Sequence, residues 1–281
     1  MEAALAQRPA TTPNLNWHSP QRAATLPAMD VHLCQLDSVW ENRAASHERA
    51  RRLLAAAKPG KDSLIVLPEM FSTGFSTNLS VTCQTDARED ESFLRELALE
   101  YRSTVMGGVV SPAPGGKGFN QSVTFDASGN EAARYSKIQP FLLGAEGECH
   151  DPGSRVCTFA LGQFTVAPFV CYDLRFPEHF RTAVKMGADL MVVIASWPVK
   201  RHHHWLTLLQ ARAIENLAFV IGVNRTGADP NFLHNGRSVV VSPHGHIIAD
   251  AGEGEQVLSA RIEAETARQW RQDFPALQEI R

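Results

Sequence analysis

The chain has 281 residues, of which 44% are hydrophobic and 20% charged. This composition supports a sizeable buried core and excludes a chain that is disordered throughout. The 27 Lys and Arg residues nearly balance the 30 Asp and Glu residues, which argues against a nucleic acid or an anionic membrane as the main partner. No apolar run approaches the ~18 residues of a transmembrane helix. The five cysteines include no C-x-x-C pair, so we expect a reduced, cytoplasmic setting without a disulfide framework or a zinc ribbon.

Residues 1–28 differ from the rest of the chain and have the character of a flexible N-terminal extension. The segment has no strand pattern and carries scattered prolines, at Pro9, Pro13, Pro20 and Pro27. It lacks the apolar stretch of a secretory signal, and its Arg, Ser and Thr content only weakly resembles a transit peptide. We expect a single folded domain to occupy residues 29–281.

Helical and extended patterns alternate along this domain. Apolar runs and two-residue periodicity predict strands at 31–36, 64–67, 104–110, 121–125, 164–170, 190–195, 218–223, 238–241, 247–249 and 256–262. Helical spacing of apolar residues and breakers at the ends predict helices at 42–57, 91–102, 177–186 and 203–216. Pro168 is expected to interrupt its strand. The alternation, closed by a strand-rich stretch, indicates one α/β domain with a mixed sheet and helices outside.

Several common catalytic and metal-binding motifs are missing from the sequence. There is no G-x-S-x-G elbow, no G-x-x-x-x-G-K-[ST] loop and no G-x-G-x-x-G fingerprint. His202, His203 and His204 are consecutive, and neighbouring helical residues point about 100° apart, so they do not converge on one ion. Cys149 and His150 have no second Cys or His at ligand spacing. We therefore expect no serine α/β-hydrolase, no nucleotide site and no bound metal.

Two charged residues stand out because of where they lie relative to the predicted strands. Glu69, in LIVLPEMF, directly follows a buried strand and a proline, and open α/β sheets carry their sites at such strand ends. Lys137, in RYSKIQPF, precedes an apolar aromatic turn. Taken alone, the glutamate is more typical of a loop and the lysine of a surface side chain lying over the fold.

A third residue, Cys171, lies between an apolar strand and a helix that begins near Pro177, in FTVAPFVCYDLRFPE. A lone buried cysteine is usually inert. A cysteine at a strand-to-helix elbow differs, because the backbone N–H groups that follow it are free to stabilise a thiolate and an oxyanion. We therefore expect Cys171 to have a low pKa and to react with iodoacetamide faster than the other four cysteines.

Together these motifs resemble a known family. LPEMFSTGF, YSKIQPF and CYDLRFPE, in the order Glu, Lys, Cys, are similar to the nitrilase (carbon–nitrogen hydrolase) superfamily. The resemblance runs from about residue 29 to the C-terminus and is greatest to the ω-amidase branch, through FNQSVTFDASG, ASWP, HWLTLLQARAIEN and VVVSPHGHIIADAG. It implies a four-layer α-β-β-α sandwich that pairs as a homodimer of eight layers, αββα:αββα. It also implies an enzyme that needs no metal or organic cofactor.

The resemblance assigns roles to the three residues. Cys171 is the nucleophile that attacks an amide carbon and forms a thioester. Glu69 accepts the thiol proton, protonates the departing ammonia and then activates water. Lys137 and the backbone N–H of Tyr172 hold the tetrahedral oxyanion, and losing one such donor typically costs ~10²–10³ in rate.

The family pattern also indicates a second glutamate, and this chain departs from the pattern after Lys137. The family often carries a glutamate seven residues before the glycine of a Pro-Gly turn, and Glu146 has that spacing here, with Glu148 as the competitor. Glu146 would hold Lys137 or the leaving amine in place. The family usually has a histidine where this chain has Gln139, followed by Pro140, and both changes are expected to reshape the pocket wall.

The substrate implied by the ω-amidase branch is the terminal amide of a short α-keto acid, 2-oxoglutaramate or 2-oxosuccinamate, hydrolysed to the dicarboxylate and ammonia. The carboxylate remote from the amide needs a cation or free N–H groups. Arg175, Lys200 and Arg201 are available, although we expect Arg175 to pair with nearby acids instead. The aromatic residues that could wall the site, or else belong to the ordinary core, are Phe71, Phe75, Phe141 and Trp197.

Two other classes of function stay open on the sequence. A nitrilase proper or an N-carbamoyl amide hydrolase would use the same three residues on a different small molecule. A non-catalytic interaction protein could share the fold, but it would have no need to keep Glu69, Lys137 and Cys171 together.

Overall fold

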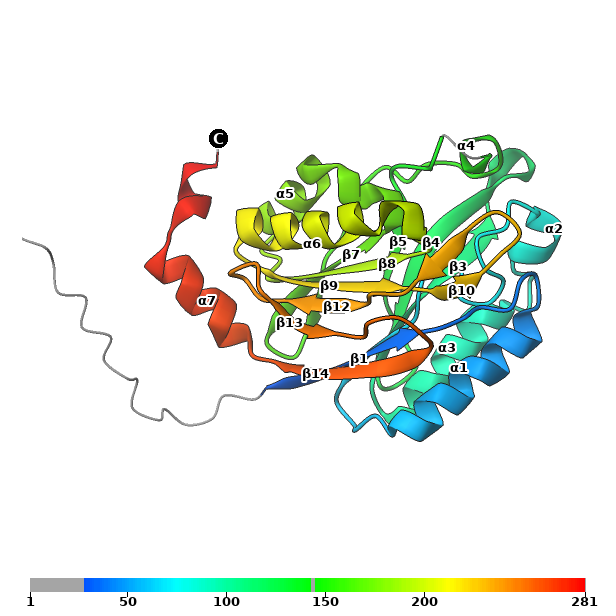
Figure 1. Ribbon diagram of the computed structural model, residues 1–281, viewed down its shortest axis with the longest axis horizontal. Coiled ribbons are helices and arrows are strands. Elements are labelled where there is room, and N and C mark those ends of the chain that lie inside the picture. The colour runs from blue at the N-terminus through cyan, green and yellow to red at the C-terminus, as the bar shows by residue number, and fades with distance from the viewer. Residues whose placement is uncertain (1–27, 143–144, 281) are drawn as a thin grey trace, which may run out of the picture.

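The computed structural model describes residues 28–142 and 145–280 of the chain (Figure 1). Within these residues the strands form two six-stranded sheets and one two-stranded hairpin. The sheets pack face to face and helices cover their outer faces, which gives four layers in the order α-β-β-α. The sandwich implied by the family resemblance is therefore confirmed. The extension expected at residues 1–28 lies outside the described residues, apart from Ala28.

The first sheet has the order β14-β1-β2-β3-β4-β5. Its strands are β1 (Met29–Gln35), β2 (Leu64–Val66), β3 (Thr104–Pro112), β4 (Gly118–Phe125), β5 (Glu131–Ser136) and β14 (Gln256–Ile262). β1, β2 and β3 are parallel, whereas β14 pairs antiparallel with β1, and β4 pairs antiparallel with β3 and β5. The last strand of the chain therefore lies beside the first.

The second sheet has the order β13-β12-β9-β8-β7-β6. Its strands are β6 (Phe159–Leu161), β7 (Phe164–Val170), β8 (Leu190–Ala195), β9 (Phe219–Asn224), β12 (Val239–Val241) and β13 (Ile247–Asp250). The central strands β7, β8 and β9 are parallel, and the outer pairs are antiparallel. A separate hairpin of β10 (Thr226–Ala228) and β11 (Leu233–Asn235) follows β9.

The long helices form the outer layers. α1 (Arg43–Ala57) and α3 (Glu89–Tyr101) cover the first sheet, and α5 (Pro177–Lys185) and α6 (His202–Asn216) cover the second (Figure 1). The remaining helices are α2 (Leu79–Thr82), α4 (Glu146–Cys149) and α7 (Ala264–Asp273), and the 3₁₀ turns are η1 (Pro114–Gly116), η2 (Cys171–Arg175), η3 (Val199–Arg201) and η4 (Ala276–Glu279). Among the described helices, none is long and apolar enough to cross a membrane.

Local sequence explains where these helices begin and end. The side chain of Asn42 accepts a hydrogen bond from the N–H of Ala45 at 3.1 Å and caps the start of α1. Lys58 ends that helix in the left-handed conformation, directly before the Pro-Gly breaker. Pro177 occupies the first turn of α5, where a missing N–H costs nothing.

The core is divided between two layers by the alternation of side chains along the strands. Leu64 and Val66 of β2 point into the space between the sheets and belong to the main core. Ile65 and Leu67 point the other way and pack in a second core beneath α1 and α3. Central strands such as β2, β8 and β9 are buried on both faces, which explains their continuous apolar runs in the sequence.

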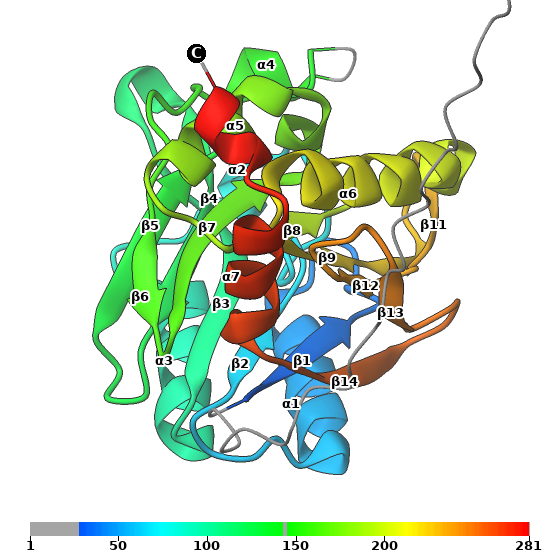
Figure 2. The same ribbon diagram turned by 90° about the vertical axis from the view of Figure 1, so that its left-hand side faces the viewer.

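Several features differ from the sequence-based expectation, which included one mixed sheet where the structure has two, and which lacked β6, β10 and β11. β5 has few apolar residues and was not predicted, and it reaches the sheet because β4 pairs along its length. α7 (Figure 2) was also not predicted. It carries Arg271, which donates to the carbonyls of Ala188 and Leu217 at 2.7 and 2.9 Å. Pro168 does not interrupt β7. Pro168 stays in register with Val192 of β8, and its missing N–H removes no bond to β6, which pairs only as far as Val166.

The ends of several strands meet at one edge of the sandwich, and a close backbone contact fixes the first of them. Gly108 of β3 donates its N–H to the carbonyl of Pro68 at 3.1 Å. A Cβ at position 108 would lie 2.5 Å from the Cα of Glu69, so only glycine permits this approach. The segment after β2 is therefore held directly against β3.

Candidate active site

Glu69 and Lys137, which follow β2 and β5, come together in the interior. Both side chains are essentially unexposed, and the Lys137 Nζ lies 2.9 Å from the Glu69 Oε1. The same nitrogen lies 2.9 and 2.8 Å from the two carboxylate oxygens of Glu146. One buried ammonium thus joins two buried carboxylates. The alternative that Lys137 is a surface side chain is wrong.

The Glu69 carboxylate is held at both oxygens. Oε1 accepts from the Lys137 ammonium and, at 2.7 Å, from the side-chain amide of Asn120. Oε2 accepts from the backbone N–H of Ser196 at 2.8 Å. These donors come from both sheets, and they fix the plane of the carboxylate before any substrate binds.

Glu146, and not Glu148, is the second glutamate of the cluster. Its carboxylate accepts from Asn120 at 2.8 Å and from the backbone N–H of Phe141 at 2.6 Å, besides the two contacts with Lys137. Burial alone would raise the pKa of Glu146, but the charge and hydrogen bonds of Lys137 hold it below its ordinary value. Glu148 lies two residues further along α4 and is exposed.

Lys137 stays positively charged in this setting. Burial disfavours the ammonium, but the opposite charges of Glu146 and Glu69 outweigh it and raise the pKa of Lys137 above its ordinary value. Its Nζ also lies 5.4 Å from the centroid of the Phe75 ring. The ammonium is therefore a fixed donor and not a proton carrier.

Cys171 occupies a sharp elbow at the end of β7. Its φ of 48° lies in the left-handed region, which a non-glycine residue adopts at a cost of roughly 1–3 kcal/mol. The elbow places the thiol beside Glu69. Burial, the negative charge of Glu69 and a hydrogen bond to it raise the pKa of Cys171 well above its ordinary value, and the charge of Lys137 opposes them. The expectation of a low-pKa thiol is therefore wrong for the resting protein.

Tyr172 is the second residue of η2, so its backbone N–H has no partner within that short helix. Asp173 follows and is fully buried. It accepts from the N–H groups of Val170 and Gln139 at 3.0 and 2.9 Å and from the Tyr135 hydroxyl at 2.8 Å. Burial raises the pKa of Asp173 to about 6. This carboxylate ties the cysteine elbow to the segment that follows Lys137.

A narrow pocket opens onto Cys171. Three of the aromatic residues named from the sequence line it: Phe75, Phe141 and Trp197. The other lining residues are Tyr172, Arg175, Ser196, Pro198, Arg201 and Phe232. Phe71 is not among them. It is fully buried and stacks with Phe93 in the core beneath α1 and α3, because the chain turns at Met70, whose φ is 47°. Phe71 is therefore a core residue and not a wall of the site.

Two further expectations about the pocket are corrected. Gln139 and Pro140 do not line it, since the Gln139 side chain turns toward His179, with 3.3 Å between the two nitrogens. Arg175 does not pair with an acid within the described residues. It lies on the pocket wall with its guanidinium 4.9 Å from the centroid of the Trp197 ring. Lys200 is exposed and does not reach the pocket.

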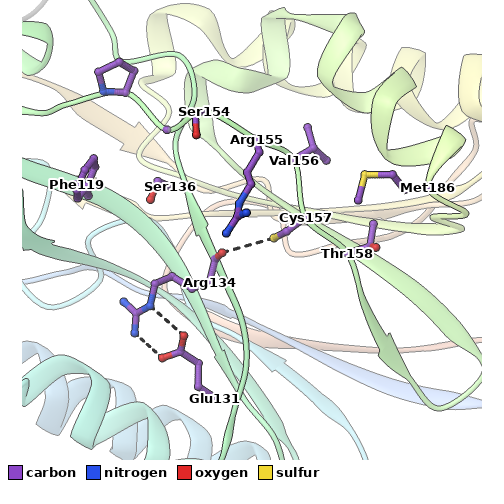
Figure 3. A pocket seen from close by; sticks show the side chains of 12 residues that line it. Phe119, Glu131, Arg134, Ser136, Ser154, Arg155, Val156, Cys157, Thr158 and Met186 are labelled. Atoms are coloured by element: carbon purple, nitrogen blue, oxygen red, sulfur yellow. Dashed lines mark hydrogen bonds and ion pairs between the residues drawn. The ribbon is translucent and has the colours of Figure 1, made fainter.

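A wider groove lies elsewhere, between β5 and the segment 152–158 (Figure 3). Arg134 and Glu131, both on β5, form an ion pair at one side of it, and the Cys157 thiol donates to the Arg134 carbonyl at 3.6 Å. The groove contains none of the clustered residues Glu69, Lys137 and Cys171. The cluster therefore adjoins the narrower pocket, which Cys171 lines.

Asn120, Asp173 and the N–H of Ser196 were not identified from the sequence. Each lies in a stretch that carried the family resemblance, FNQSVTF, CYDLRFPE or ASWP. Consecutive polar residues within a strand, such as Asn120, Gln121 and Ser122 of β4, were the available signal. Phe232 of the β10–β11 hairpin had no such signal.

Comparison with known proteins agrees with this geometry. The model of the carbon-nitrogen hydrolase family matches residues 30–272. The chain belongs to the carbon-nitrogen hydrolase family. The omega-amidase YafV of Escherichia coli (strain K12) is 33% identical over 257 residues, which cover 90% of this chain and 97% of that protein. The 2-oxoglutaramate amidase of Bacillus subtilis (strain 168) is 32% identical over 219 residues, which cover 78% of this chain and 85% of that protein.

Solved structures of family members have the same fold. The structure of XC1258 from Xanthomonas campestris, a CN-hydrolase superfamily protein, has a TM-score of 0.85 and 31% identity, and covers 91% of this chain and 98% of that one. The structure of Nit3 of Saccharomyces cerevisiae has a TM-score of 0.79 and 27% identity, and it covers 88% of this chain and 94% of that one. This member of the family is therefore an enzyme that hydrolyses carbon–nitrogen bonds, and its similarity to the ω-amidase branch is confirmed.

Replacing Asn120 tests whether its amide positions the two glutamates. Asn120→Ala removes hydrogen bonds to charged groups, which are worth roughly 1.5–3 kcal/mol each. We expect kcat to fall about 10- to 100-fold, with a smaller change in KM, when ammonia release is measured. Gln121→Ala is the matched control, because that neighbour points to Ser136 and away from the glutamates. A parental kcat in a folded Asn120→Ala protein would contradict the positioning role.

The raised pKa of Cys171 yields a second prediction. Glu69→Gln removes the negative charge that disfavours the thiolate and leaves Lys137 in place, so the pKa of Cys171 should fall. Turnover should nevertheless fall by at least ~10²-fold, because the proton acceptor is lost. The thiolate absorbance, titrated against pH with a matching Cys171→Ala protein subtracted, measures the pKa. Glu148→Gln should change neither quantity, and a pKa that stays or rises in Glu69→Gln would refute the electrostatic account.

Proposed function

We propose that this enzyme is a thiol amidohydrolase in which Cys171, Glu69 and Lys137 perform the chemistry. The observation that carries the proposal is their convergence: a thiol, a fixed carboxylate and a fixed ammonium meet at the end of one aromatic pocket. Amide carbons are poor electrophiles, so hydrolysis needs a strong nucleophile together with a proton acceptor and an oxyanion donor. These residues supply all three.

The first step transfers a proton within the cluster. The Cys171 thiol gives its proton to Glu69 as the sulfur forms a bond with the amide carbon. The carbonyl oxygen gains the negative charge and is stabilised by Lys137 and by the free N–H of Tyr172. Lys137 makes two contacts with Glu146, and one of them can be exchanged for the oxyanion.

The second half of the reaction reverses the proton movement. Glu69, now protonated, gives its proton to the departing amine, and the carbon–nitrogen bond breaks to leave a thioester on Cys171. Glu69 then accepts a proton from water as the water oxygen attacks the thioester. Collapse of the second tetrahedral intermediate releases the acid and returns the proton to sulfur. Glu146 keeps Lys137 charged and oriented throughout.

We further propose that the substrate is a short ω-amide of an α-keto acid. The relatives named omega-amidase and 2-oxoglutaramate amidase support this assignment. Phe75, Phe141 and Trp197 narrow the pocket, which favours a compact substrate. Arg175 and Arg201 make part of the same wall cationic, as a substrate with a remote carboxylate requires. The homodimer of eight layers and the cytoplasmic location stay predictions, the first from the family resemblance and the second from the cysteine content.

The nucleophile is tested by Cys171→Ala. We expect ammonia release to be lost while the thermal unfolding temperature is kept, because alanine fits the space and lacks the sulfur. Mass spectrometry of a quenched reaction should show an acyl group on Cys171 of the parent enzyme. Cys157→Ala, which changes a cysteine outside the pocket, serves as the control. Turnover near the parental rate in Cys171→Ala would reject the assignment.

The substrate class is tested by ammonia release from a panel of 2-oxoglutaramate, glutamine, asparagine, an aliphatic nitrile and an N-carbamoyl amino acid. We expect 2-oxoglutaramate to have a higher kcat/KM than glutamine, which carries an added ammonium. A neutral nitrile leaves the cationic wall unpaired, at a cost of ~1–3 kcal/mol. Equal or better kcat/KM on the nitrile or the carbamoyl compound would refute the ω-amide assignment and leave the Cys, Glu and Lys chemistry intact.

A further inference from the structure

Two arginines share the pocket wall with Cys171. Arg175 lies in η2, four residues after the cysteine, and Arg201 ends η3. Neither guanidinium forms an ion pair with a carboxylate within the residues that the structure describes. The other half-buried or buried arginines have anionic or carbonyl partners, as Arg134 has in Glu91 and Arg212 in the carbonyl of Leu174.

Aromatic rings hold the two cations in place without neutralising them. The Arg175 guanidinium lies 4.9 Å from the Trp197 ring centroid and 5.8 Å from that of Tyr172. The Arg201 guanidinium lies 5.4 Å from the Phe141 ring centroid, and the Trp197 indole donates to the Arg201 carbonyl at 2.8 Å. Stacking on ring faces leaves the in-plane N–H donors available.

The two like charges also oppose each other. Burial, together with repulsion from Arg201, lowers the pKa of Arg175 below its ordinary value. Beyond the rings, the Arg175 Nη2 lies 3.1 Å from the Nδ1 of the exposed His204. Among the residues that line the pocket wall, two carry partly desolvated guanidinium groups and none is an acid, so this wall is complementary to an anion.

We propose that Arg201, assisted by Arg175, binds the substrate carboxylate remote from the scissile amide and so selects anionic amides that lack an α-ammonium group. This assignment rests on the proposed amidohydrolase function and names the residues that set its specificity. Two guanidinium groups attract a carboxylate, and they repel the ammonium that glutamine or asparagine would bring beside it. Keto acids and desamino acids with a terminal amide avoid that repulsion.

A matched pair of amides separates charge recognition from general damage. Glutaramate, the monoamide of glutaric acid, carries the carboxylate and no α substituent, and pentanamide is its uncharged counterpart. In Arg201→Gln we expect KM for glutaramate to rise about 10- to 100-fold with kcat largely kept, and the kinetics on pentanamide to stay within about twofold. Lys200→Gln removes the same charge from the adjacent, exposed position and should leave the kinetics on both substrates unchanged. Arg201→Lys should recover part of the affinity.

Binding to an inactive protein keeps this inference separate from the function. Calorimetry with the Cys171→Ala protein should show that it binds glutaramate. Adding Arg201→Gln to this protein should raise the Kd for glutaramate at least tenfold, and adding Lys200→Gln should leave the Kd unchanged. If this pattern appears in a protein whose parent releases no ammonia from any amide, the amidase proposal fails and the carboxylate site stands. An equal loss of kcat/KM on glutaramate and pentanamide in Arg201→Gln would overturn the inference while leaving amide turnover established. Equal effects of Arg201→Gln and Lys200→Gln on glutaramate would overturn it in the same way.

Discussion

The buried ammonium of Lys137 between Glu69 and Glu146 is the interaction on which the rest of the site depends. Removing three charges from water costs several kcal/mol per ion unless each is paired and hydrogen-bonded. Two carboxylates and one ammonium leave an excess negative charge, and the amide of Asn120 and the N–H groups of Ser196 and Phe141 offset it. These donors come from a strand of the first sheet, the end of the second sheet and a loop, so the cluster forms only when the sandwich is assembled.

The same cluster explains why Cys171 rests as a thiol. Cys171 lies beside a carboxylate that repels a thiolate, and the pKa of the thiol is raised accordingly. In the proposed reaction the proton moves to Glu69 only as the sulfur bonds to carbon. The charge then passes to the oxyanion beside Lys137 and does not have to be carried by a free thiolate. A protein that holds a neutral thiol between turnovers is also less exposed to oxidation of sulfur.

Local patterns of apolar residues and breakers allowed prediction of an α/β domain and of most of its elements, whereas the four-layer sandwich was implied by the family resemblance. The strand ends that precede Glu69 and Cys171 are examples. Contacts that join the two sheets were not predictable in this way, because the partner of a side chain such as Asn120 comes from distant parts of the chain. Phe71 and Phe75 show the same limit: a backbone turn between them sends one ring into the core and the other into the pocket.

The distribution of charge in the pocket also bears on product release. In the proposed reaction the anionic pair Glu69 and Glu146 lies at the Cys171 end of the pocket, whereas Arg175 and Arg201 line the pocket wall. A substrate with a neutral amide and a remote carboxylate satisfies both regions. Hydrolysis turns the amide into a second carboxylate, which then faces Glu69 once that residue has lost its proton. Repulsion between like charges in a partly desolvated site weakens product binding relative to substrate, so the hydrolysis itself favours departure of the dicarboxylate.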